Sequence, residues 1–182
     1  MSEPAPPRRP DVETMDEHAF VDTFGGVYEH SPWVARAVWR SADNRVLTDA
    51  ERLAEAMRQV VEQAEETQQM TLIRAHPDLG GKLAVAGGLT AASAREQAGA
   101  GLDGCTPAQY ERLQTLNDAY TQKFGFPFIV AVKGLTREDI LAAMQARLDN
   151  DAATERRRAL DEIHRIARFR LAALLDQALP GT

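Results

Sequence analysis

The chain has 182 residues, and 44% of them are hydrophobic, which is enough to bury the core of one globular domain. Its 27 acidic and 21 basic residues give a net charge of −6, which argues against nucleic acid or an anionic membrane as the main partner. The single cysteine, Cys105, excludes an intrachain disulfide framework and a cysteine-rich metal site.

The chain carries no recognisable signal for a membrane or an organelle. No apolar run approaches the roughly 18 residues of a transmembrane helix. Arg8 and Arg9 are not followed by the apolar stretch of a secretory signal, and the closing residues 180–182 are not a peroxisomal address. We therefore expect a soluble protein of the cytoplasm.

The first 13 residues hold four prolines and little that a core would bury, which predicts a disordered tail over 1–13 and a helical domain over 14–182. Three helices follow the tail, and each has a typical start signal. The three signals are Asp16, Ser31-Pro32 and a capping box from Thr48 to Glu51.

The stretch from Arg74 to Gln97 contains the first candidate for chemistry. Pro77 disfavours α conformation at His76, so we expect this histidine on an extended piece of chain. The glycine pairs at 80–81 and 87–88 allow tight turns. A histidine with restricted conformation beside such turns is a candidate acid–base group.

An alanine-rich helix is predicted after Thr90, which is a plausible N-cap. Ser93, Glu96 and Gln97 have the spacing i, i+3, i+4 and therefore share one face of this helix. That face is either a solvated surface or one wall of a polar pocket.

The second half of the chain predicts further helices: one from Thr106-Pro107 to about Phe124, one capped by Thr136 and Asp139, and one from Ala152 to Ala178. Between the first two, residues 126–132 form a β-like run with no partner strand elsewhere, so we expect an extended segment buried among helices. The fold class is all-α: a single-domain, orthogonally packed bundle of about seven to nine helices.

The extended run at 126–132 has backbone groups that no helix uses, and buried backbone groups must find partners. The run is either a packed linker or a wall of a pocket that hydrogen-bonds a small polar ligand.

The last helix contains a second anomaly. Its apolar stripe is formed by Leu160, Ile163, Ala167, Leu171 and Leu174. Arg165 and Arg168 point away from the stripe, but Arg170 occupies a position where an apolar residue is expected. A buried guanidinium requires a carboxylate, with Glu96 as one candidate, or a ligand.

His76, Glu96 and Arg170 together suggest acid–base chemistry on an anion. A metal site is poorly supported, because His76 and Asp78 have no second histidine at helical spacing. Ser93 lies in no strand–turn–helix elbow, and no glycine motif follows a strand. The residues alone indicate a cofactor-free acid–base enzyme acting on a small polar molecule.

Six segments resemble the OHCU decarboxylase family, whose members act on 2-oxo-4-hydroxy-4-carboxy-5-ureidoimidazoline (OHCU), the last intermediate of urate breakdown. They are Phe24 to Trp33, Ala75 to Leu79, Ser93 to Gln97, Leu116 to Tyr120, Lys123 to Ile129 and Glu162 to Leu171. The resemblance covers about Asp16 to Leu175. It implies an all-helical fold, a homodimer, a small ureide substrate and no cofactor or metal.

The resemblance also assigns residues by position. The family's catalytic histidine, glutamate and arginine fall on His76, Glu96 and Arg170. A shifted alignment of the last motif would place the arginine on Arg168 instead. The substrate-lining positions fall on Pro77, on Ser93, Ala94, Arg95, Glu96 and Gln97, and on the backbone of Phe128, Ile129, Val130, Ala131 and Val132.

The implied reaction is decarboxylation of OHCU to (S)-allantoin and CO2. Three alternatives stay open at this point: a decarboxylase of another ureide, a non-catalytic binder of allantoin or a related ureide, and a structural interaction protein. In the last case Arg170 and Glu96 would form only a buried salt bridge.

Overall fold

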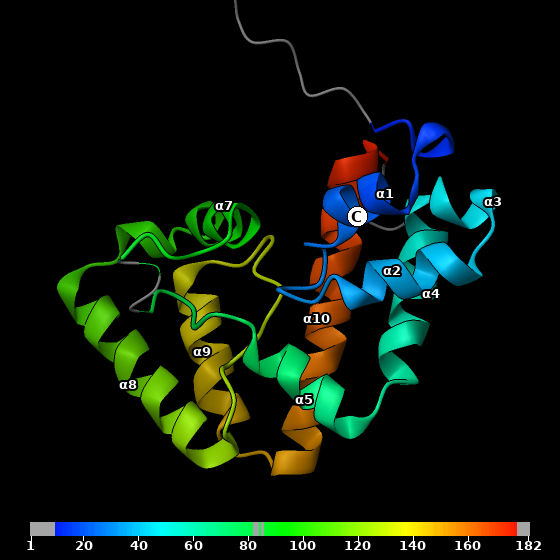
Figure 1. The fold of residues 1–182 in the computed structure, drawn as a ribbon. Helices are drawn as coiled ribbons and strands as arrows, with labels where there is room; N and C mark the ends of the chain where they lie inside the picture. Colours follow the sequence, from blue (N-terminus) through cyan, green and yellow to red (C-terminus); the bar gives the residue numbers. More distant parts are fainter. Residues whose placement is uncertain (1–9, 82–83, 85, 178–182) are drawn as a thin grey trace, which may run out of the picture. The chain divides into compact units, whose positions relative to one another are not determined.

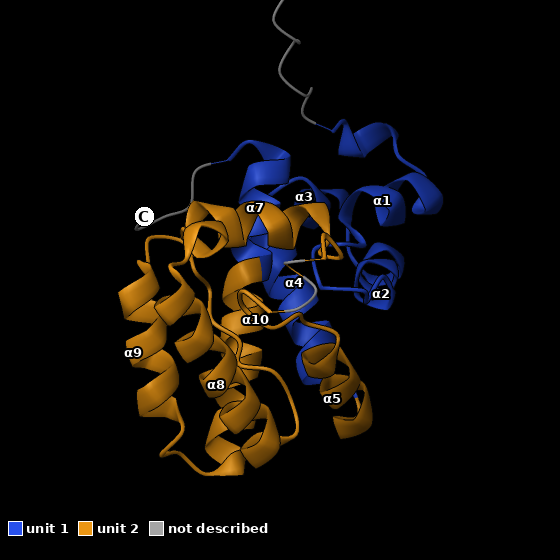
Figure 2. Cartoon of the chain, turned by 90° about the vertical axis from the view of Figure 1, so that its left-hand side faces the viewer, with its two compact units in different colours: residues 1–64, 167–182 blue, residues 65–166 orange. Residues whose placement is uncertain are grey.

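The computed structural model describes residues 10–81, 84 and 86–177, and in these residues it contains nine α-helices, two 3-10 helices and no strand (Figure 1). The predicted all-α class is confirmed. The chain divides into two compact units, residues 1–64 with 167–182 and residues 65–166 (Figure 2). The predicted single domain over 14–182 contains parts of both.

Unit 1 is built from the N-terminal helices and the end of the last helix. Its elements are η1 (Val12–Thr14), α1 (Glu17–Phe24), α2 (Trp33–Ser41), α3 (Asn44–Leu47), α4 (Ala50–Glu62) and the part of α10 (Ala152–Leu175) from residue 167 onward. Helix α2 packs against α1 and α4, and α3 packs against α4 and η1. Phe20, Val38 and Met57 are among the fully buried side chains that hold these helices together.

Aspartates cap three of these helices: Asp16 accepts from the N–H of Ala19, and Asp43 and Asp49 do the same for α3 and α4. The capping box predicted at Thr48 to Glu51 is therefore wrong by one residue. The Thr48 hydroxyl instead donates to the carbonyl of Asn44 at the end of α3. This four-residue helix was not predicted, because it is too short to show a hydrophobic period.

The tail predicted over 1–13 falls mostly on residues 1–9, which lie outside the described residues. Within its last part, Val12 begins the 3-10 helix η1 and is buried.

Unit 2 contains α5 (Glu66–Arg74), α7 (Ala91–Gly99), η2 (Leu102–Gly104), α8 (Pro107–Phe124), α9 (Arg137–Arg147) and the first part of α10. Thr90, Thr106 and Thr136 are the N-caps of α7, α8 and α9, as predicted. Helix α5 was not predicted, since its first turns carry mostly polar residues and only Leu72 and Ile73 supply buried apolar side chains.

The segment between α8 and α9 forms no strand, in agreement with the sequence. Gly125 ends α8 with a φ of 76°, a left-handed conformation that glycine adopts without strain. Five of the next seven side chains are buried: Phe126, Phe128, Ile129, Ala131 and Val132. The segment is therefore fixed by packing and does not depend on a sheet.

The last helix ends earlier than predicted. Helix α10 stops at Leu175, and the predicted end at Ala178 lies outside the described residues. Leu174, expected in the apolar stripe, is 37% exposed, whereas Leu175 is fully buried. The apolar stripe therefore continues from Leu171 to Leu175, four residues later, which a period of 3.6 residues allows. Among the described residues no helix is long and apolar enough to cross a membrane.

Candidate active site

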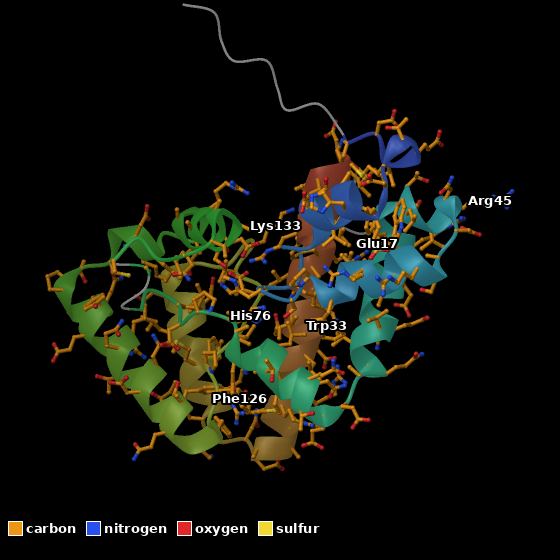
Figure 3. The ribbon with its side chains drawn as sticks, in the orientation of Figure 1. Glu17, Trp33, Arg45, His76, Phe126 and Lys133 are labelled. Carbon is orange, nitrogen blue, oxygen red and sulfur yellow. The ribbon has the colours of Figure 1, made fainter. Side chains whose placement is uncertain are left out.

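His76 lies directly after helix α5, where the chain turns toward Pro77 (Figure 3). Its side chain is buried, and its Nδ1 lies 3.0 Å from the carbonyl oxygen of Leu72, one turn back. Because a carbonyl oxygen only accepts, Nδ1 carries the hydrogen and Nε2 holds the lone pair of the neutral ring. The local fold thus gives His76 a defined tautomer, with its basic nitrogen at Nε2.

The loop after Pro77 is held by a side-chain amide from α7. The Oε1 of Gln97 accepts from the N–H of Gly80 over 2.8 Å, and its Nε2 donates to the carbonyl of Asp78 over 3.3 Å. Gln97 is buried, so these bonds form away from solvent. They fix the position of the loop that carries His76 and Pro77 relative to α7.

Two further amides hold the same loop from α8. Gln114 Nε2 donates to the carbonyl of Gly80 over 2.8 Å, and Asn117 Nδ2 donates to the carbonyl of Leu79 over 3.0 Å. Gly80 has a φ of 58°, a left-handed conformation that glycine adopts without strain, and a Cβ there would lie 2.5 Å from the Leu113 side chain, which would have to shift. Sequence reasoning did not identify Gln114 or Asn117 as contributors.

The polar face predicted on α7 exists. Ser93 and Gln97 are buried and Glu96 is half-buried, while the side chains of Ala94 and Arg95 are exposed. Nearby, burial raises the pKa of the Asp78 carboxyl, and the like charge of Asp118 raises it further.

Side chains hold the backbone of residues 128–132 at two points. The Ile129 carbonyl accepts from Arg147 Nη1 over 2.7 Å, and the Ala131 N–H donates to Glu162 Oε2 over 2.8 Å. Among the described residues, the backbone of Val130 makes no hydrogen bond. In a trans peptide the N–H and C=O point in opposite directions, so the Val130 N–H points away from Arg147 and the Val130 carbonyl points away from Glu162.

Arg170 belongs to unit 1 and is buried there, as its position in the stripe predicted. Its Nη1 lies 2.8 Å from Glu29 Oε2 and 3.3 and 3.4 Å from the carbonyl oxygens of Gly26 and Val27. Glu29, from the loop between α1 and α2, is a buried carboxylate that sequence reasoning did not identify as a partner. Arg168, the alternative assignment, is partly exposed and pairs with Glu51 over 2.6 Å.

Three other charged residues near this machinery were also missed: Arg147, Glu155 and Glu162. Both glutamates are buried on α10, seven residues apart and therefore on the same side of the helix. Neither glutamate lies in the apolar stripe of Leu160, Ile163 and Ala167, so the helical pattern gave no signal for them. Within the described residues no group of three or more histidine, cysteine or acidic side chains is arranged to hold a metal ion.

Comparisons with known proteins identify the family of this chain. A family model described as OHCU decarboxylase matches residues 13–172. The chain is 47% identical over 161 residues to the 2-oxo-4-hydroxy-4-carboxy-5-ureidoimidazoline decarboxylase of Haloferax volcanii, covering 88% of this chain and 92% of that one. It is 44% identical to the protein of the same name from Halalkalicoccus jeotgali, covering 90% and 89%.

A crystal structure of (S)-allantoin synthase superposes with a TM-score of 0.70 and 32% sequence identity. The match covers 90% of this chain and 52% of that one, so the chain spans about half the length of that protein. The family match extends over nearly all the described residues of both units. The chain therefore belongs to the OHCU decarboxylase family.

Proposed function

We propose that this chain catalyses the cofactor-independent decarboxylation of OHCU to (S)-allantoin and CO2, the last step of urate-to-allantoin conversion. The observation that carries the proposal is the 47% identity to a protein named for this reaction, over nearly the full length of both chains. The chain is accordingly a carboxy-lyase.

The substrate's own structure makes the reaction possible. Its carboxylated carbon adjoins an imine carbon. As CO2 leaves, the electron pair of the breaking C–C bond forms a C=C bond, and the π pair of the C=N bond moves onto the ring nitrogen, which takes a proton from solvent. The protein must then hold the molecule in the reactive geometry and control two protons.

His76 is the proposed proton carrier. Its Nε2 lone pair accepts the proton of the 4-hydroxyl group, and the same nitrogen then protonates one face of the enol-like intermediate. The Leu72 carbonyl supports this role, because it keeps the Nδ1 hydrogen in place during both transfers. Protonation from one face gives (S)-allantoin instead of the racemate.

Glu96 and Gln97 are the proposed partners of the ureido N–H groups, and Pro77 with residues 93–95 complete that wall. Gln97 has a second task, since its amide already holds Asp78 and Gly80. We assign the direct carboxylate contact to Glu96, because a charged acceptor forms the stronger hydrogen bonds.

Arg170 is the proposed ligand of the substrate carboxylate or of a ring carbonyl, since its planar fork matches such groups. Glu29 supports this role by fixing Nη1. The backbone of residues 128–132 lines the substrate. Within it the N–H and C=O of Val130 are the groups proposed to bind, because the Ile129 carbonyl and the Ala131 N–H are already bonded to protein side chains.

The proposal extends to assembly and compartment. The family resemblance supports a homodimer, and a chain with one cysteine suits the reducing cytoplasm. Light scattering coupled to gel filtration tests the dimer: a mass of one chain at assay concentrations would contradict it.

The decisive experiment follows optical activity. OHCU is generated fresh from urate, the protein is added, and the circular dichroism of (S)-allantoin is recorded against buffer and against heat-denatured protein. We expect optically active allantoin to appear much faster with the native protein. If it appears no faster than in buffer, the proposed function is wrong.

A further inference from the structure

A buried charged cluster lies beside the 128–132 segment and has no part in the chemistry described above. Glu155, which is fully buried, accepts from the Tyr120 hydroxyl and from Arg147 Nε over 2.9 Å at Oε2, and from Asn150 Nδ2 over 2.7 Å at Oε1. Arg147 Nη2 also lies 2.9 Å from Oε2, close enough for charge attraction although its N–H is not aligned for a hydrogen bond.

The cluster keeps Glu155 charged. Burial alone would raise the pKa of its carboxyl, but the hydrogen bonds from Arg147, Asn150 and Tyr120 outweigh burial, and the pKa is lowered. Burial and the bond to Glu155 in turn raise the pKa of the Tyr120 hydroxyl, which therefore stays a donor. Arg147 thus faces a permanent carboxylate.

Stability alone is a poor reason for this arrangement. Replacing a buried ion pair with apolar side chains of similar volume is often neutral or stabilising, because two charges no longer have to leave water. An apolar pair would, however, leave the Ile129 carbonyl without its donor, since Arg147 Nη1 supplies that hydrogen bond. Only the guanidinium group of Arg147 can pair with Glu155 and also hold the backbone of residues 128–132 by a hydrogen bond.

Arg147 contacts the 128–132 segment at two places. The guanidinium carbon of Arg147 lies 4.4 Å from the ring centroid of Phe128, and its Nη1 binds the next carbonyl, that of Ile129. On the other side of Val130, Glu162 binds the Ala131 N–H. The peptide groups on both sides of Val130 are therefore fixed by buried charged side chains from α9 and α10.

We propose that Arg147, anchored by Glu155, Tyr120 and Asn150, is a positioning residue that orients the 128–132 segment so that the Val130 peptide groups face the ureide. This inference rests on the proposed function for its substrate. Arg147 itself touches no reacting atom and acts through the backbone at Ile129.

The test compares Arg147→Lys with Arg40→Lys. Lysine keeps a positive charge beside Glu155 but lacks the fork that reaches both the carboxylate and the Ile129 carbonyl. Arg40 is the matched control, because its Nε and Nη2 lie 3.3 and 2.9 Å from the two carboxylate oxygens of Glu17, in an exposed pair. Both variants are assayed with fresh OHCU well below their unfolding temperatures.

We expect Arg147→Lys to raise KM by about tenfold, the factor for losing one hydrogen bond to a charged group, with a smaller change in kcat. Amide hydrogen exchange at Val130 and Ala131 should also accelerate, and Arg40→Lys should match the wild type in both readouts. If Arg147→Lys keeps the wild-type KM and exchange rates, the inference is wrong, whatever happens to its melting temperature.

Tyr120→Phe covers the case in which Arg147→Lys does not fold. It removes one donor to Glu155 and keeps the ring. A smaller increase in KM together with faster exchange at Val130 supports the inference, and unchanged values overturn it. Amide hydrogen exchange is measured without substrate. An inactive wild-type protein would therefore refute the proposed function, while the exchange rates would still test whether Arg147 orders the 128–132 segment.

Discussion

In the described part of each unit, a buried arginine pairs with a buried glutamate and also binds at least one backbone carbonyl. In unit 1, Arg170 Nη1 contacts Glu29 and the carbonyls of Gly26 and Val27. In unit 2, Arg147 contacts Glu155 and, through Nη1, the carbonyl of Ile129. The chemistry of the two pairs is the same, so their difference lies in what holds the carboxylate.

Glu155 lies on helix α10 and accepts from side chains on α8, on α9 and in the turn before α10. Glu29 lies on the loop between α1 and α2, next to His30, whose φ of 49° is in the left-handed region. Donors from three elements hold Glu155, which therefore anchors Arg147 to the helices, whereas Glu29 joins Arg170 to the loop between α1 and α2. Burial alone therefore does not identify a substrate arginine.

The largest expected effect comes from removing the anchor. Glu155→Ala leaves the Arg147 charge buried without its carboxylate, and we expect the free energy of unfolding to fall by about 3–5 kcal/mol in urea titrations. Asp161→Ala, which removes an exposed partner of Arg157 on the same helix, should cost no more than about 1 kcal/mol. Equal losses in the two variants would show that Glu155 anchors nothing.

The next effect separates the two candidate substrate arginines. Arg170→Lys keeps the charge beside Glu29 but removes the planar fork, and we expect kcat/KM to fall by about a hundredfold, as for a misplaced substrate. Arg168→Lys, at the partly exposed pair with Glu51, should remain close to wild type. A larger loss in Arg168→Lys would transfer the substrate role to that residue.

Much of the fold follows from local signals in the sequence. The N-caps at Asp16, Thr90, Thr106 and Thr136 are correct because a capping side chain needs only the backbone three residues on. The anomaly at Arg170 was visible because a charge interrupts an apolar stripe.

Arg147 and Glu155 gave no such signal. Arg147 lies in the last turn of α9 and Glu155 in the first turn of α10, where each charge also suits the helix dipole. Their pairing is a tertiary contact across the turn between the helices. The hydrogen bonds that hold Ile129 and Ala131 likewise depend on side chains far along the chain, which no local pattern predicts.

Acid titration gives a smaller effect that distinguishes the anchored carboxylate. The pKa of Glu155 is lowered in the folded chain, so its contribution to stability is complete above the ordinary value of 4.5 and is lost as the pH falls through the lowered pKa. We expect the difference in unfolding free energy between wild type and Glu155→Gln to shrink below pH 4.5. A difference that does not change with pH would show that the Glu155 charge contributes nothing.

The smallest expected effect is at Asp78, where the charged form lowers the stability of the fold, in contrast to the stabilising charge of Glu155. The pKa of Asp78 is raised by burial and by Asp118, so stability falls as the pH rises above 3.8 and the loss is complete once the pH exceeds the folded pKa. Asp78→Asn should therefore melt slightly higher than wild type at pH 7, and the gain should vanish at pH values below 3.8, where the carboxyl is protonated in both states. A lower melting temperature at pH 7 would contradict this assignment.

The most direct test of the account is the optical activity of the allantoin formed by His76→Ala, with His18→Ala as the control, since His18 is an exposed histidine paired with Asp22. With helicity unchanged, we predict that His76→Ala forms (S)-allantoin no faster than buffer, whereas His18→Ala keeps the wild-type rate. Rapid formation of (S)-allantoin by His76→Ala would show that the proton comes from elsewhere.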